Sequence, residues 1–167
     1  ARGEVEAERL RAAEAAAAVE SQRLAAKWSY SVSNDAMTSR ELRSATIQSE
    51  NTVSFSSPYG GAQRATLMLR NHPTHGRDVM LVIERGQMLC MSYTDCQIRV
   101  RFDENNPERW SAVGPSDNSS TMIFLRSEAR FRERMRRAKV VRIQVPVYQE
   151  GDPVFEFQVG GFSYERF

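Results

Sequence analysis

From Trp28 to the end of the chain, apolar residues recur at alternate positions in short stretches, which is the pattern of strands that bury one face. The first stretch is Trp28-Ser-Tyr-Ser-Val, and turn sequences such as Pro58-Tyr-Gly-Gly separate the stretches that follow. Many short strands at regular spacing are typical of an antiparallel sandwich or barrel. The predicted strands cover residues 28–32, 42–47, 53–55, 65–69, 78–83, 97–103, 110–113, 121–125, 140–148 and 154–159.

One segment interrupts this alternation with a helical pattern. Ser127 as N-cap, an acidic residue after it and basic residues near the end predict a helix over residues 128–139. Its predicted core-facing stripe consists of Phe131, Met135 and Ala138. The predicted fold of residues 28–167 is therefore mainly β: an antiparallel β-sandwich or half-open barrel with one packed α-helix.

Residues 1–27 differ in composition, since nearly all of them are Ala, Glu, Arg and other strong helix formers. Leu10, Ala13, Ala17 and Leu24 form a thin stripe, but charged residues interrupt it at positions that a coiled coil keeps apolar. We interpret this segment as a solvent-exposed helical stalk or linker that precedes the β-domain. Packing of the helix on a neighbouring molecule is the alternative.

The two cysteines of the chain, Cys90 and Cys96, lie at mirror positions about Tyr93. We predict a β-hairpin that turns at Tyr93 and places the two sulfur atoms opposite each other, where they can form a disulfide. Two unrelated free cysteines in the core of a cytosolic protein are the alternative. A disulfide predicts an oxidising compartment such as the bacterial periplasm.

Length and charge place few further limits on the chain. Its 167 residues suit one domain of ordinary size, and 23 basic residues nearly balance 21 acidic ones. No apolar run approaches the length of about 20 residues that spans a bilayer. The sequence starts at Ala1 without an initiator methionine or a signal peptide, so we expect that a signal or a membrane anchor upstream of residue 1 has been removed.

The search for catalytic or metal-binding residues yields one weak candidate. His72 and His75 could supply two metal ligands with Asp78 as a third, but a solvated hairpin loop is the simpler interpretation. The serine-rich stretch after Gly114 lacks a nucleophile elbow, and Asp103 with its acidic neighbour is better explained by a turn that ends a strand. We therefore predict no enzymatic activity, no cofactor and no metal site.

The strongest charged feature is the helical segment, in which basic residues outnumber acidic ones. Such a surface could contact an acidic protein, anionic lipid or nucleic acid, although a solvated helix face whose arginine stems cover apolar surface is the simpler interpretation. We predict no nucleic-acid binding, because no aromatic stacking motif accompanies the arginines.

Several segments together resemble a group of proteobacterial cell-envelope proteins that includes the VasI-type accessory protein of type VI secretion systems. The matching elements span about residues 28–162. They are Trp28-Ser-Tyr, Asp35-Ala-Met-Thr, residues 45–55, Pro58-Tyr-Gly-Gly, Leu67-Met-Leu-Arg, Asp78-Val, Cys90, Val100-Arg-Phe-Asp, Phe131, Ala138-Lys and Phe155-Glu-Phe-Gln-Val-Gly-Gly-Phe. The resemblance implies an envelope protein of this fold and carries over no functional residue.

These observations favour a non-enzymatic periplasmic domain that binds another protein, as an accessory component of a secretion or envelope machine. The alternative is an immunity or inhibitor protein that neutralises a toxic effector acting in the envelope. Exposed aromatic residues and arginines dominate interface energetics. The predicted partner-binding residues are Tyr59, Tyr93, Trp110, Arg132 and Arg136. For Trp110 a place in the core is the alternative, and Trp28 is predicted to be a core residue.

Overall fold

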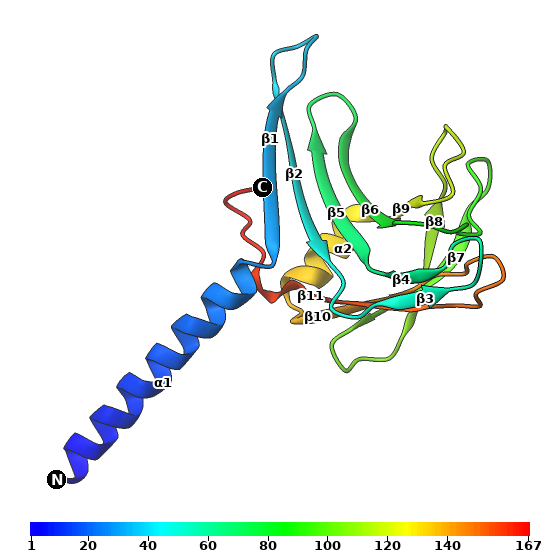
Figure 1. Cartoon of the computed structure of the whole chain (residues 1–167). Coiled ribbons are helices and arrows are strands. Elements are labelled where there is room, and N and C mark those ends of the chain that lie inside the picture. Colours follow the sequence, from blue (N-terminus) through cyan, green and yellow to red (C-terminus); the bar gives the residue numbers. More distant parts are fainter.

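The computed structural model describes all residues from 1 to 167 as one long helix joined to a β-rich domain (Figure 1). Helix α1 (Arg2–Ala25) projects from the domain and has no buried residue. Its 24 residues correspond to a length of about 36 Å. The predicted helical stalk is therefore present as an exposed helix. No helix of the chain is both long enough and apolar enough to cross a membrane.

The domain is built on one antiparallel sheet of nine strands in the order β1-β2-β5-β6-β9-β8-β7-β10-β11. In chain order these strands are β1 (Trp28–Asn34), β2 (Glu41–Gln48), β5 (Ala65–His72), β6 (Gly76–Ile83), β7 (Cys96–Phe102), β8 (Glu108–Val113), β9 (Met122–Leu125), β10 (Val140–Gln144) and β11 (Val154–Gln158). A separate short hairpin pairs β3 (Val53–Phe55) with β4 (Gly61–Gln63). The mainly β prediction is confirmed.

The sheet curls strongly without closing, so that its two edge strands come near each other (Figure 1). Residues after β2, the neighbour of edge strand β1, contact edge strand β11: the Glu50 amide donates to the Glu156 carbonyl at 2.7 Å, and the Asn51 side-chain oxygen accepts from the Glu156 amide at 2.8 Å. The Asn51 amide group also donates to the Val154 carbonyl. Of the two predicted architectures, the half-open barrel describes this arrangement, because strand pairing runs through a single open sheet.

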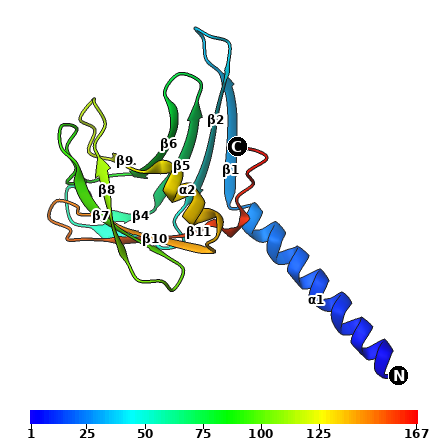
Figure 2. The ribbon, with the colours of Figure 1, turned by 180° about the vertical axis from the view of Figure 1, so that it is seen from behind.

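Helix α2 (Glu128–Arg136) packs against the buried face of the curled sheet and lies nearest the viewer in Figure 2. The predicted stripe is confirmed: Phe131, Met135 and Ala138 are all buried. Phe131 packs on Phe102 and Trp110, with ring centroids 5.6 and 5.8 Å away. Ser127 is the N-cap residue, as predicted, but it adopts the left-handed conformation (φ 59°) and its side chain makes no capping hydrogen bond. The helix also ends earlier than predicted, at Arg136.

The junction between α1 and the domain is closely packed. The short 3₁₀ helix η1 (Val159–Gly161) touches the end of α1, and a Cβ on Gly161 would lie 2.2 Å from the carbonyl carbon of Leu24. Trp28 is buried as predicted, and its indole nitrogen donates to the Val159 carbonyl at 3.3 Å. These contacts determine the direction in which the helix leaves the domain.

Candidate partner-binding surface

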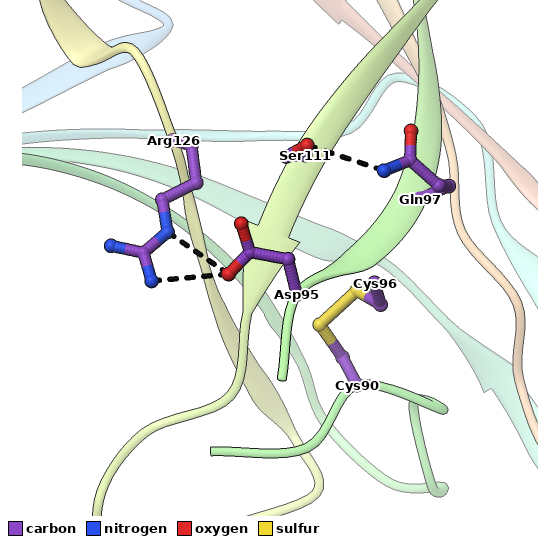
Figure 3. The surroundings of a disulfide bond; sticks show 6 residues. All are labelled: Cys90, Asp95, Cys96, Gln97, Ser111 and Arg126. Atoms are coloured by element: carbon purple, nitrogen blue, oxygen red, sulfur yellow. Dashed lines mark hydrogen bonds and ion pairs between the residues drawn. A yellow bond between two sulfur atoms is a disulfide. The ribbon is translucent and has the colours of Figure 1, made fainter. Parts of the chain in front are cut away.

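The predicted disulfide is present: Cys90 and Cys96 are bonded, with their Cα atoms 5.2 Å apart (Figure 3). The hairpin predicted around it is wrong. Residues 84–95, which we name the disulfide loop, contain no strand, and β7 begins only at Cys96. The segment before Cys90 lies instead along residues 146–148: Met88 forms an isolated bridge with Val147, and the Leu89 amide donates to the Pro146 carbonyl.

Backbone contacts hold the disulfide loop against the end of the barrel. The Gly114 amide donates to the Met91 carbonyl at 2.9 Å, and a Cβ on Gly114 would lie only 2.3 Å from the Cys90 carbonyl oxygen. Glycine is therefore required here for a close approach of two backbone segments. On the other side, the Leu89 amide donates to the Pro146 carbonyl at 2.9 Å.

Polar contacts add to this support. Asp95 Oδ1 accepts from two guanidinium nitrogens of Arg126, at 3.1 and 3.2 Å, and Gln97 donates to the Ser111 hydroxyl beside it (Figure 3). The disulfide, the Gly114 contact and these hydrogen bonds together give the loop a defined shape.

The loops at this end of the barrel expose large apolar and aromatic side chains. Tyr93 is 83% exposed, Met91 51%, Tyr148 50% and Leu89 46%. The Tyr148 amide donates to the Gln87 carbonyl, so the segment that carries Tyr148 lies beside the disulfide loop. We call the surface formed by these four side chains the disulfide end. It lies on the side of the domain opposite to α1 (Figure 1).

A shallow groove of about 130 Å³ separates the disulfide loop from residues 115–120 and includes Leu89 and Met91 in its lining. A larger groove of about 440 Å³ lies on the outer face of β1, β2 and β5, and only polar side chains line it. We place the candidate site at the smaller groove, because interface cores are enriched in methionine and aromatic residues and not in hydroxyls.

Two of the five predicted partner-binding residues belong to this part of the molecule. Tyr93 lies at the disulfide end itself. Tyr59 is half-buried at its border, where its hydroxyl accepts a hydrogen bond of 2.7 Å from Gln87. The interpretation of Tyr59 and Tyr93 as contact residues stays a prediction.

The prediction for Trp110 is wrong, because this side chain is only 3% exposed. Its ring meets Phe131 edge-on from the concave side of the sheet, and the Arg130 guanidinium lies 4.5 Å from its ring centroid. The indole nitrogen donates to Glu108 at 3.3 Å. Trp110 is a core residue and cannot serve as a surface contact in this conformation.

Arg132 and Arg136 lie on α2 and are not brought together with Tyr93. Arg132 forms an ion pair with Glu128 at 2.8 Å, and its carbonyl accepts a hydrogen bond from the Tyr164 hydroxyl. The exposed Arg136 lies over the ring of Tyr164 at 5.6 Å. Burial raises the pKa of the Tyr164 hydroxyl, although the two arginines oppose this shift.

Other arginines of α2 cover the core, as the simpler interpretation of this helix proposed. Arg134 is 2.8 Å from Glu108 and stacks over Phe102 at 4.5 Å, while Arg130 reaches the same carboxylate at 3.6 Å. Burial acts to raise the pKa of Glu108, but hydrogen bonds from Arg134 and Trp110 and the charges of both arginines outweigh it. The pKa of Glu108 is therefore below its ordinary value.

The histidine candidate does not assemble. The His72 Nδ1 accepts hydrogen bonds from the amides of Thr74 and His75, at 3.0 and 3.1 Å, and Asp78 is paired with Arg70. Nowhere in the chain do three His, Cys, Asp or Glu side chains gather in an arrangement that could hold a metal ion.

Sequence reasoning missed Leu89, Met91 and Tyr148. For the first two residues the signal was present: Met88 and Cys90 are buried, and strict alternation then turns Leu89 and Met91 outward. No comparable signal marks Tyr148, whose exposure depends on how residues 145–151 fold back beside the disulfide loop.

Comparison with known proteins adds little to this description. No protein-family model matches the chain, and no curated protein matches it. The crystal structure of invasion associated protein B from Bartonella henselae aligns over 81% of this chain and 86% of that chain, with a TM-score of 0.48 and 12% sequence identity. We draw no conclusion from so distant a likeness, and the resemblance to the VasI-type group stays a prediction.

Proposed function

We propose that this chain is a non-enzymatic protein-interaction domain of the bacterial cell envelope, an accessory component of a secretion or envelope machine that binds its partner through the disulfide end. One observation carries the proposal: Leu89, Met91, Tyr93 and Tyr148 are exposed together on loops that a disulfide and backbone contacts hold in place. Binding residues concentrate on loops positioned by a rigid scaffold, and ordered loops lose less entropy on binding.

The disulfide also supports a location in an oxidising compartment, and we propose the periplasm. In this proposal α1 holds the domain away from a membrane to which an upstream segment tethers it. The disulfide end then faces away from the tether, since it lies on the opposite side of the domain from α1 (Figure 1). Such an arrangement leaves the binding surface accessible to a partner.

Site-specific photo-crosslinking in cells tests the binding surface. A photoreactive amino acid placed at Tyr93 or at Tyr148 is expected to capture the same envelope protein. The matched control is Met37, which is 91% exposed in the turn between β1 and β2, away from the disulfide end. Equal capture from position 37, or no capture from positions 93 and 148, would contradict the proposal.

The affinity of the captured partner gives the quantitative test. Truncating a central aromatic contact costs about 2 kcal/mol, which corresponds to a loss of roughly 30-fold in affinity. We expect Tyr93→Ala to show such a loss and Met37→Ala to bind like the wild type. A captured component of a secretion machine supports the accessory role, whereas a captured toxin would assign the immunity role to the same surface.

A further inference from the structure

The outer face of β7 and its two neighbours carries four arginines, away from the residues of the disulfide end. The pairing register places Arg99 of β7 directly opposite Arg109 of β8, and Arg101 of β7 directly opposite Arg142 of β10. Like charges directly opposite each other destabilise a sheet. The sheet has two such opposed arginine pairs, and each of them includes one residue of β7.

Carboxylates neutralise one of the two pairs. Arg142 is 2.9 Å from Glu156, and Arg101 is 3.1 Å from Glu104. The other pair has no such partner, because neither Arg99 nor Arg109 forms an ion pair, and both side chains are exposed. The two guanidinium groups start from directly opposed backbone positions, about 5 Å apart at their Cα atoms, and can reach the same point above the sheet.

A groove of about 170 Å³ lies beside Arg99, on the side of β7 that faces β10, and Arg109 is not part of its lining. Arg99, Arg101 and Arg142 line it together with Gln144, and Pro107 and Val154 add apolar surface. Gln144 is directly opposite both Arg99 on β7 and Val154 on β11, so it forms the part of the groove next to Arg99. The groove therefore offers guanidinium donors on a partly apolar floor.

We propose that Arg99 and Arg109 together bind a phosphate monoester group, free or carried on a larger molecule, on the outer face of β7 and β8 next to this groove. Each guanidinium presents a planar set of N–H donors that matches two phosphate oxygens. A phosphate carries between one and two negative charges at neutral pH and balances both arginines, whereas a single carboxylate leaves one of them uncompensated. The site is separate from the proposed partner surface and does not depend on it.

Titration with inorganic phosphate at low ionic strength tests the site, with the arginine Nε–H signals followed by NMR and chloride as the control anion. We expect saturable binding by the wild type and at least tenfold weaker binding by the double variant Arg99→Gln/Arg109→Gln. The matched control is Arg77→Gln, because Arg77 is also exposed and without an ion pair but lies on β6. Unsaturable shifts in the wild type, or equal weakening in the control, would overturn the proposal.

A second variant separates geometry from charge. Arg99→Lys/Arg109→Lys keeps both charges but loses the bidentate fork, so it should bind phosphate more weakly than the wild type. Binding as tight as that of the wild type would refute the recognition by two guanidinium groups. Because the glutamine variant removes a repulsion, its Tm should be no lower than that of the wild type, and loss of binding then does not reflect misfolding.

Vesicles identify the source of the phosphate. If the wild type sediments with phosphatidic acid vesicles and not with phosphatidylcholine vesicles, and the double glutamine variant loses this sedimentation, the phosphate group belongs to a lipid headgroup. Saturable binding of inorganic phosphate without sedimentation would assign it to a soluble phosphate compound. Vesicle binding that the double variant retains would show that other residues cause it and would contradict the proposed site.

Discussion

Breaking the disulfide tests the view that the disulfide loop is a preorganised binding element. The bond joins residues six positions apart in the sequence and so closes a small ring. For a ring of this size, the loss of chain entropy in the unfolded state gives a stabilisation of about 2 kcal/mol at 25 °C. For a domain of this size that corresponds to a decrease in Tm of roughly 4–8 °C on reduction.

The assay is equilibrium unfolding followed by the fluorescence of the two buried tryptophans, Trp28 and Trp110. Three samples are compared: the oxidised wild type, the reduced wild type and the variant Cys90→Ala/Cys96→Ala. Reduction removes the bond but keeps both sulfur atoms in place, whereas the variant also leaves a cavity, since Cys90 is buried. The variant should therefore be the least stable of the three.

An unfolding free energy that reduction leaves unchanged would refute the reasoning, because the ring would then impose no constraint on the unfolded chain. A further measurement addresses the binding surface. Amide hydrogen exchange should accelerate more in residues 84–95 of the reduced protein than in the β10–β11 pair, where only the loss of about 2 kcal/mol in global stability acts. Uniform acceleration over both regions would show a global loss of stability and no local role of the disulfide.

Three further substitutions probe other contacts, each checked by equilibrium unfolding unless stated. Gly114→Ala should cost about 1–3 kcal/mol, because its Cβ would overlap the Cys90 carbonyl oxygen; the cost should shrink in the reduced protein, where the loop can move. Glu108→Gln should cost about 1 kcal/mol at neutral pH, since its charge-assisted hydrogen bonds lie at a site a third exposed. The pKa of Glu108 is lowered in the folded protein, so this stabilisation is complete above its unfolded pKa of about 4.3 and disappears as the pH falls through the folded pKa. A difference in unfolding free energy between wild type and Glu108→Gln that does not change with pH would refute the stabilising role of the Glu108 charge. Gly161→Ala should loosen α1 from the domain, because its Cβ would overlap Leu24, and faster tryptic cleavage at Lys27 measures this effect.

Alternating burial could be predicted from the sequence, but strand neighbours could not. Every predicted strand range contains or overlaps an observed strand, because period-two patterns report which face each residue turns to the core. The hairpin predicted about Tyr93 is wrong because the same patterns do not report which segments pair. Residues 88–91 do alternate between buried and exposed, yet Met88 meets Val147 in an isolated bridge instead of a paired strand. The alternation carries no information about which segment lies alongside.

The candidate site was predictable only in part, because it depends on contacts between segments far apart in sequence. The cysteine pair is local and was found. Trp110 was assigned to the surface because a lone tryptophan suits either a core or an interface, and only the position of α2 over it decides between them. The opposed arginine pairs on β7 could not be seen either, since strand register follows from the complete sheet order.

The two ends of the domain differ in a way that bears on how the proposed binding surface would work. At one end, the close approach of Gly161 to Leu24 and the ion pair of Lys27 with Glu50 at 2.7 Å fix the direction of α1. At the other end, the disulfide and Gly114 fix the loops that carry Tyr93. The strands between them form one continuous sheet, so the direction of α1 determines where the disulfide end points. Loosening the α1 junction should therefore leave the affinity of the isolated domain unchanged and reduce capture of the partner only when the chain is tethered through α1.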